Sequence, residues 1–282
     1  MKEALAKFYR FGNSWTGTVI IVLIVIFFFA QAFKIPSGSM LPTLLIGDHL
    51  FVKKFAYGIP TPHIPFVEIP VLPDFKGDGH LISADGPKRA DIVVFRPPFN
   101  EKIHYVKRNV AISGDEVMVH NGTLYLKPKG GDDEIKADFA NYEVIKIGGK
   151  NWVKNPYANE FPGIHTELPK ILPSMSAPEL TDPDLYYEGH KNDTDFFGLN
   201  FYAPSDPLTD KRLYFGPYVI PQNNYFMMGD NRDHSQDSRY FGPVEYRSIV
   251  GQPWFVYFSW DDDYRVRWER IGKTVNTLER EK

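Results

Sequence analysis

The stretch Pro36-Ser37-Gly38-Ser39-Met40-Leu41-Pro42-Thr43-Leu44 begins within a few residues of the end of the chain's only long apolar run. Two serines flank a glycine, and prolines on both sides fix the backbone angle φ, so the stretch favours a shaped loop over a helix or a strand centre. It places reactive hydroxyls directly after the apolar run. The same residues would also suit a plain turn that ends a membrane anchor, and other parts of the chain decide between the two interpretations.

The composition is that of a globular protein. The 282 residues are 43% hydrophobic and 24% charged, enough for one or two domains with a sizeable core. A formal net charge of -3 and the lack of a lysine- and arginine-rich block argue against nucleic-acid binding. The absence of cysteine excludes disulfides, a thiol nucleophile and cysteine-bound metal. The 23 prolines, 22 phenylalanines and 16 tyrosines favour a fold rich in strands and loops.

The apolar run has the properties of a membrane anchor. No charged residue lies between Arg10 and Lys34, and residues 15–33 have roughly the length of a helix that crosses a bilayer. We therefore predict one transmembrane helix over 15–33. Basic residues dominate residues 1–14, which places that segment in the cytoplasm and the chain after the helix on the far side. The alternative is a cleavable signal peptide, since Ala30-Gln31-Ala32 has the small-x-small form of a cleavage site.

Several segments after the serine stretch have the pattern of β-strands. Turn residues separate short runs of alternating or continuous hydrophobicity, which predicts a mainly β, antiparallel fold. The predicted strands cover 49–55, 90–95, 103–110, 116–120, 123–126, a run from 225 that ends in the turn at 229–230, and 251–259, with 265–268 completing the sheet. Residues 59–88 are rich in proline and glycine and predict a long surface excursion.

The middle of the chain has a different character. Residues 127–218 are polar, rich in proline and aromatic residues, and without a sustained period. We predict that they form an inserted, non-catalytic lobe of short strands and loops that packs at the edge of the main sheet. The catalytic β domain is then expected in two parts, 34–126 and 219–272, and residues 273–282 are expected to form a frayed tail.

The third predicted strand contains a residue that gives the serine stretch a chemical role. Alternation places Tyr105 and Lys107 on one face and Val106 and Arg108 on the other. A serine hydroxyl needs an adjacent base at neutral pH, and a lysine can be that base when burial lowers its pKa. Without cysteine or a patterned Ser/His/Asp set, the sequence favours a hydrolytic pair of Ser39 and Lys107. The alternative is that Lys107 is an ordinary solvated strand residue.

A dense polar stretch follows the turn at 229–230. It contains Asn231-Arg232-Asp233-His234-Ser235-Gln236-Asp237-Ser238-Arg239. A calcium loop that begins at Asp233 is disfavoured, because Ser238 occupies the glycine position and Val244 the position of the bidentate glutamate. Asp237 lies between two arginines, which predicts a buried brace of paired charges. The alternative is a solvated polar loop.

Together these segments resemble type I signal peptidase, the bacterial leader peptidase. The resemblance rests on residues 35–44 with Gly47-Asp48 after an anchor, on 89–95, on 105–108 with Gly114-Asp115, and on 229–239, in this order. It covers less than half of the chain, and the middle lobe matches only in its position. Departures are Ala90 and His234, where glycine and asparagine are common, and a single anchor where some members have two. None of them touches Ser39 or Lys107.

The resemblance implies an antiparallel β catalytic domain of the signal peptidase type, interrupted by a cap. It implies a dyad with Ser39 as nucleophile and Lys107 as general base. The backbone N–H of Ser39 and the hydroxyl of Ser37 would form the oxyanion hole, and Ser235 would orient the lysine amine. Other residues match supporting positions: Asp237, Arg239, Asp230, Arg232 and Arg108. A further set matches the walls of the small S1 and S3 pockets: Phe33, Ile35, Leu44, Tyr105 and Val106. No metal or other cofactor is expected.

The implied function is that of a membrane-bound serine endopeptidase, a hydrolase that removes N-terminal signal peptides from exported preproteins. It would cleave after small residues through an acyl-enzyme. The expected partners are signal-peptide-bearing preproteins and the lipid bilayer, with no nucleic acid. The expected location is the bacterial cytoplasmic (inner) membrane, single-pass, with the catalytic domain on the extracytoplasmic side.

Two alternatives are weighed against this function. One is a catalytically silent, membrane-tethered peptide-binding module, which the loss of Ser39 or Lys107 would indicate; both residues are present. The other is a self-cleaving Ser/Lys repressor. That reading requires an N-terminal DNA-binding domain, and the apolar run occupies its place.

Overall fold

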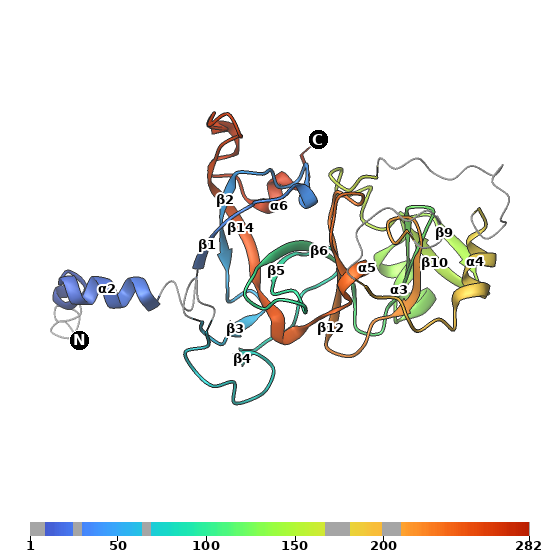
Figure 1. Ribbon diagram of the computed structural model, residues 1–282, viewed down its shortest axis with the longest axis horizontal. Coiled ribbons are helices and arrows are strands. Elements are labelled where there is room, and N and C mark those ends of the chain that lie inside the picture. Colours follow the sequence, from blue (N-terminus) through green and yellow to red (C-terminus); the bar gives the residue numbers. More distant parts are fainter. Residues whose placement is uncertain (1–8, 25–29, 64–68, 167–180, 199–209, 282) are drawn as a thin grey trace.

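The computed structural model describes residues 9–24, 30–63, 69–166, 181–198 and 210–281. Its strands form a sheet of seven strands, a sheet of five strands and a two-stranded sheet (Figure 1). All strand pairings within these sheets are antiparallel. The prediction of a mainly β, antiparallel fold is therefore confirmed.

The seven-stranded sheet contains most of the strands predicted from the sequence. Its order is β1-β2-β14-β5-β6-β12-β13. The bounds are β1 (Ala30–Lys34), β2 (Asp48–Lys53), β5 (Ile92–Phe95), β6 (Tyr105–Ile112), β12 (Asn224–Met228), β13 (Val244–Glu245) and β14 (Ile249–Ser259). The long strand β14 pairs with β2 on one side and β5 on the other, with register shifts along both pairings. Such shifts bend a strand and increase its twist, which allows the sheet to curl.

The five-stranded sheet lies at the other end of the molecule from the N-terminal helix (Figure 1). Its order is β11-β7-β8-β10-β9, with β7 (Glu116–His120), β8 (Thr123–Lys127), β9 (Val144–Ile147), β10 (Lys150–Lys154) and β11 (Phe215–Val219). Helices α3 (Gly131–Asp138) and α4 (Pro183–His190) belong to the same region. The middle of the chain thus has a regular sheet of its own, which includes β7. The turn Asn121-Gly122, with positive φ at both residues, keeps β7 and β8 paired.

Two regions differ from the sequence predictions by being more ordered. Within the predicted excursion 59–88, β4 (His80–Ser83) pairs with β3 (Gly58–Pro60). The tail after residue 273 is not frayed: α6 (Val275–Leu278) buries Val275 and Leu278. The predicted frayed tail is therefore wrong, because these two apolar side chains anchor the chain end.

The predicted final strand 265–268 is also wrong. The structure places only a single bridge there, between Trp260 and Val266, and the short helix η6 (Trp268–Arg270) follows. The reason is an ion pair farther along the chain. Arg270 donates from Nη2 to the buried Asp48 at 2.6 Å, which draws the segment into a turn instead of along the sheet edge.

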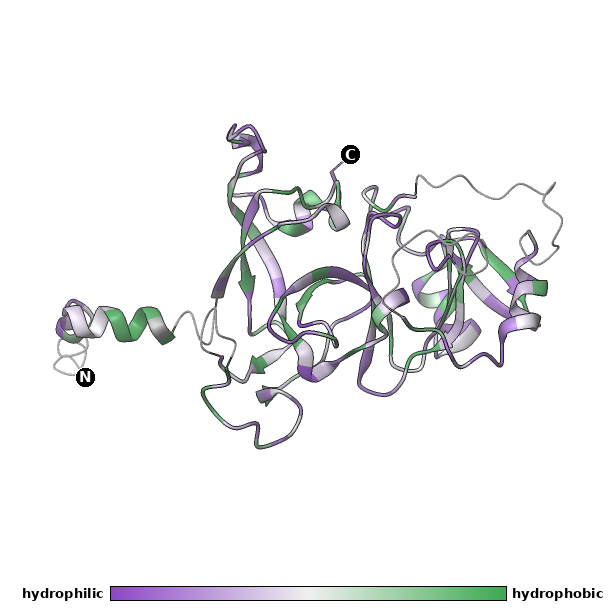
Figure 2. Ribbon diagram, in the orientation of Figure 1, coloured by the Kyte–Doolittle hydropathy of each residue, from purple (hydrophilic) through white to green (hydrophobic). Residues whose placement is uncertain are grey.

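The predicted transmembrane helix coincides in part with α2 (Trp15–Ile24), an exposed and strongly apolar helix (Figure 2). Residues 25–29 lie outside the described part of the chain. From Ala30 to Lys34 the chain is a strand, paired with β2 from Lys53 to His49. The prediction of helix is therefore wrong at 30–33, because the main-chain groups of these residues bond to β2. Among the described residues, no helix combines the length and the apolarity that crossing a membrane requires.

Candidate active site

Ser39 lies in η2 (Gly38–Met40), a 3₁₀ helix of one turn that follows shortly after the end of β1. Met40 and Leu44 on its C-terminal side are buried in a core cluster of the seven-stranded sheet, which holds the turn against the sheet. The end of β12 approaches from the other side. A Cβ atom at Gly229 would lie 2.4 Å from the carbonyl oxygen of Ser39, so only glycine permits this contact. The N–H of Asn231 donates to the same oxygen at 3.2 Å.

Lys107 reaches Ser39 from β6, where it lies opposite Val93 of β5. Its side chain is buried, and Nζ hydrogen-bonds Oγ of Ser39. Burial lowers the pKa of Lys107 from 10.5 to about 8; Asp237 opposes this shift and Arg239 adds to it. The structure therefore brings together the two residues that the sequence pairs. A lysine with a lowered pKa is the kind that can act as a general base.

Gly229 and its neighbours also hold Ser235 close to the pair. A Cβ at Gly229 would come within 2.3 Å of the Ser235 hydroxyl oxygen. That oxygen is buried and has no hydrogen-bond partner among the residues that the structure describes. Ser37 precedes the 3₁₀ turn, is exposed, and makes no capping hydrogen bond with its side chain. Both serines predicted to assist the pair therefore have hydroxyl groups that are not committed to the fold.

The predicted brace of paired charges is present at Asp237. Nε and Nη2 of Arg239 donate to the two carboxylate oxygens at 2.8 Å each, and the Gly229 N–H adds a bond of 3.1 Å. Burial alone would raise the pKa of Asp237, but the Arg239 charge and its hydrogen bonds outweigh burial and lower it. The brace fixes the chain on both sides of Ser235.

A second buried pair joins Arg108 to Asp230. Arg108 donates from Nε and Nη2 to the two Asp230 oxygens at 2.8 Å each, and from Nη1 to Glu279 at 2.9 Å. The Thr43 hydroxyl donates to Asp230 at 2.7 Å. The pair thus connects the serine stretch, β6, the turn after β12 and the chain end. Burial alone would raise the pKa of Asp230, but Arg108 outweighs it and lowers it.

One departure from the family pattern, Ala90, has a physical explanation in this network. Ala90 has a φ of 73° and its carbonyl oxygen accepts a bond of 2.8 Å from Arg108. Glycine adopts that φ without strain, which explains why it is common there.

Arg232 is buried near the two carboxylates, and burial lowers its pKa to about 10. Its Nη1 lies 3.9 Å from the sulfur of Met228, while Nε and Nη2 have no partner among the described residues.

A cavity of about 300 Å³ opens beside the serine and lysine. One wall comes from β1 and the serine stretch, and the other from the start of β6. Four of the five predicted pocket residues line it: Phe33, Ile35, Tyr105 and Val106. Leu44 does not, because it is completely buried in the core cluster with Ile35 and Met40. For Leu44 the predicted contact with a substrate is therefore wrong.

The chain matches the family model "Signal peptidase, peptidase S26" over residues 9–260. It belongs to this family. It is 44% identical to signal peptidase I of Helicobacter pylori (strain ATCC 700392 / 26695), over 98% of this chain and 96% of that protein. It is 33% identical to signal peptidase I of Pseudomonas aeruginosa, over 90% of this chain and 73% of that protein. A crystal structure of a signal peptidase I from Enterococcus faecalis V583 matches at 21% identity, over 60% of this chain and 98% of that one, with a TM-score of 0.27.

Two side chains that line the cavity of this signal peptidase family member, Gln236 and His104, were not predicted from the sequence. Gln236 accepts a hydrogen bond of 2.7 Å from the Tyr105 hydroxyl. The ring of His104 packs edge-on against Phe33, with 5.0 Å between ring centroids. Gln236 lies within the matched stretch 229–239 and His104 directly before the matched stretch 105–108, so their place in the sequence was the available signal. Their partners lie far away in the chain, which concealed the contacts.

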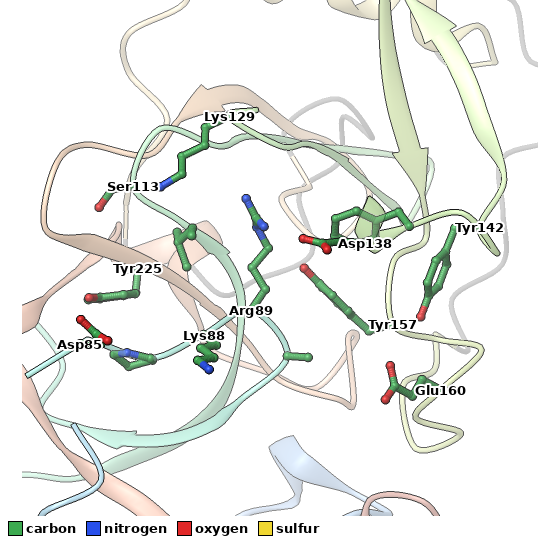
Figure 3. Close-up of a pocket in the computed structure, with 15 residues that line it drawn as sticks. Asp85, Lys88, Arg89, Ser113, Lys129, Asp138, Tyr142, Tyr157, Glu160 and Tyr225 are labelled. Atoms are coloured by element: carbon green, nitrogen blue, oxygen red, sulfur yellow. The ribbon is translucent and has the colours of Figure 1, made fainter. Parts of the chain in front are cut away.

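A larger hollow of about 700 Å³ lies between the two large sheets (Figure 3). Its central guanidinium, Arg89, donates to Asp115 at 2.7 and 2.5 Å and to Glu134 at 2.6 Å. The family's signature residues line the smaller cavity instead, which is therefore the candidate active site. Within the described ranges, no group of three histidine, aspartate or glutamate side chains is placed to hold a metal ion.

Proposed function

We propose that this chain removes signal peptides from preproteins as a serine endopeptidase in which Ser39 is the nucleophile and Lys107 the general base. Peptide hydrolysis and the class of substrate follow from membership of the signal peptidase family. The roles of the two residues rest on one observation, the hydrogen bond between Lys107 Nζ and Ser39 Oγ at the wall of the cavity.

Acylation begins with the neutral amine of Lys107. It takes the proton of the Ser39 hydroxyl, and the oxygen attacks the carbonyl carbon of the scissile peptide bond. The negative charge on the carbonyl oxygen is stabilised by the N–H of Ser39 and the hydroxyl of Ser37, each contributing roughly 3–4 kcal/mol. The Lys107 ammonium then gives its proton to the leaving amine, the C–N bond breaks, and an acyl-enzyme remains.

Deacylation repeats the same steps with water. Lys107, neutral again, takes a proton from a water molecule that attacks the ester carbonyl of the acyl-enzyme. The proton returns to Ser39 as the ester bond breaks, and the signal peptide leaves with a new carboxylate. Ser235 orients the lysine amine during both halves. Its buried hydroxyl, unpaired among the described residues, supports this role, because an unused buried hydroxyl is costly.

The walls of the cavity support binding of an extended peptide. Segments 33–37 and 104–107 face one another across it, and a peptide added between them would place alternate side chains in the cavity. A volume of about 300 Å³ is at the small end for ligand sites. The contacts of Phe33 with His104 and of Tyr105 with Gln236 narrow it further. We therefore propose cleavage after small residues, through the S1 and S3 pockets of the family.

We also propose attachment to the bacterial cytoplasmic membrane through the apolar segment that begins at Trp15. The exposed apolar side chains of α2, such as Val19, Val22 and Ile24, support a bilayer as their surroundings. With the basic N-terminal segment inside, one span places the catalytic part on the extracytoplasmic side. In this arrangement the seven-stranded sheet forms the catalytic part, and the five-stranded sheet, which includes β7 and β8, forms the cap.

The proposal is tested with the purified full chain and a precursor that carries a signal peptide. Mass spectrometry of the products gives the new N-terminus. We expect cleavage after a small residue by the wild type and none by Ser39→Ala. A precursor that binds to both proteins but stays intact with both would instead identify a catalytically silent binding module.

A further inference from the structure

The candidate active site is lined by basic side chains and by no carboxylate. The lining contains Lys34, Lys107, His104 and His234, and no aspartate or glutamate. Asp230 and Asp237, the two carboxylates whose charges act on Lys107, are buried and paired with arginines. A peptide that enters the cavity therefore meets basic groups that no lining carboxylate offsets.

Lys34 is the exposed lysine of this set, and its position on β1 is informative. Its neighbours Phe33 and Ile35 point into the core cluster and the cavity, whereas Lys34 is exposed at the cavity rim. Among the described residues its ammonium group has neither a hydrogen bond nor an ion pair. A solvated, unpaired charge at the rim of a site affects which ligands approach and how they are oriented.

A bound peptide strand has the same alternation as β1. If the residue before the scissile bond and the residue two positions earlier fill the cavity, the residue between them points away from it. That intervening side chain lies on the side of Lys34, because Lys34 likewise turns away from the pockets that Phe33 and Ile35 form. A large or charged side chain at this position would therefore not have to enter the cavity.

We propose that Lys34 gives this enzyme a preference for an acidic side chain at the second position before the scissile bond. This proposal rests on the proposed function. To the preference for small substrate residues in the pockets it adds a preference for the charge of a substrate side chain at the cavity rim. The ion pair would be exposed to solvent, so its effect is modest and is screened by salt. It acts on the specificity constant kcat/KM and leaves the chemistry at Ser39 unchanged.

The test uses the wild-type full chain and three precursors that differ only at this position, with Glu, Gln or Lys. At low salt we expect kcat/KM to fall in that order, by roughly two- to fivefold per step, which is the range of exposed ion pairs. The differences should shrink in high salt. Lys34→Gln should remove the order, and Lys34→Glu should reverse it.

Lys136→Glu is the matched control, since it makes the same change in net charge. Lys136 is exposed on α3, beside the five-stranded sheet and away from the cavity. This variant should keep the wild-type order. Equal kcat/KM for the three precursors in the wild type, or equal effects of Lys34→Glu and Lys136→Glu, would overturn the role of Lys34. Cleavage of the Gln precursor would in either case still support the proposed function, whereas no cleavage of any precursor would overturn both.

Discussion

Arg108 holds both carboxylate oxygens of Asp230 at 2.8 Å, and the side chains of both residues are fully buried. The pair lies directly behind Lys107, because Arg108 follows Lys107 on β6 and points to the opposite face. Through Asp230, which also accepts a hydrogen bond from Thr43, the pair connects β6, the serine stretch and the turn after β12. Removing one partner would leave a buried charge without compensation.

We therefore expect Arg108→Leu to lower the free energy of unfolding by roughly 3–5 kcal/mol, the usual cost of breaking a buried pair. Arg280→Leu is the control. Arg280 pairs with Glu160 at 3.1 Å on the surface, and such pairs contribute about 0–1 kcal/mol. Denaturant unfolding followed by tryptophan fluorescence gives both values. Equal losses for the two variants would contradict the structural role of the buried pair.

Replacing either member of the dyad should abolish precursor cleavage without unfolding the protein. Ser39→Ala removes the nucleophile, and Lys107→Met removes the only base that contacts it in the described part of the chain. The far-ultraviolet circular dichroism of both variants should match that of the wild type. Cleavage at the wild-type rate by a correctly folded variant would rule out the dyad.

Ser37→Ala should lower the rate of the chemical step by roughly 10²- to 10³-fold with little change in precursor affinity, because it removes one oxyanion donor. Single-turnover kinetics separate the two quantities. The side chain makes no capping bond, so stability should change little. An unaltered chemical rate would assign Ser37 to the turn alone.

The rate should increase with pH as Lys107 loses its proton. With the pKa of Lys107 lowered to about 8 by burial, kcat/KM should rise about tenfold per pH unit below pH 8 and level off above it. A pH series with a fixed precursor measures this profile. A single break near the ordinary lysine value of 10.5 would show that the base is not desolvated.

The same shift affects stability. Because the folded-state pKa lies below the unfolded value of 10.5, the unfolded chain holds an extra proton between about pH 8 and 10.5. Lys107 therefore destabilises the fold fully below pH 8, and this penalty disappears as pH rises to 10.5. Lys107→Met should raise the free energy of unfolding near pH 7 by roughly 2–4 kcal/mol. The gain should vanish toward pH 10.5, and a gain independent of pH would point to packing instead.

The parts of the fold that sequence predicted well depend on local patterns. The alternation of side chains and the turn residues located the strands around Lys107. The burial of Lys107 on its strand supports its proposed role as a base. The helix at 30–33 failed because those residues are nearly all apolar, and only a partner strand distant in the sequence, β2, makes them extended. The chain end failed because the burial of Val275 and Leu278 depends on β14 and not on any local period.

The candidate site shows the same division. Ser39, Lys107 and Asp237 belong to short motifs that carry their chemistry with them. Gln236 is different, since its role at the cavity depends on Tyr105, 131 positions away in the chain. The prediction that Leu44 lines the pocket failed for another reason. Its match to a family position did not show whether the side chain lines the cavity or lies in the core beneath it.

The pairing of β1 with β2 has a consequence for how long the intact enzyme survives among its own copies. Ala30-Gln31-Ala32 has the form of a cleavage site, and a protease acts on such a site only as a free, extended chain. Here the main-chain groups along one edge of the tripeptide are already bonded to β2. A neighbouring copy would have to detach this strand before it could cut it. We therefore expect these sheet hydrogen bonds to slow cleavage of the tripeptide by neighbouring copies, although its small residues have the form of a cleavage site.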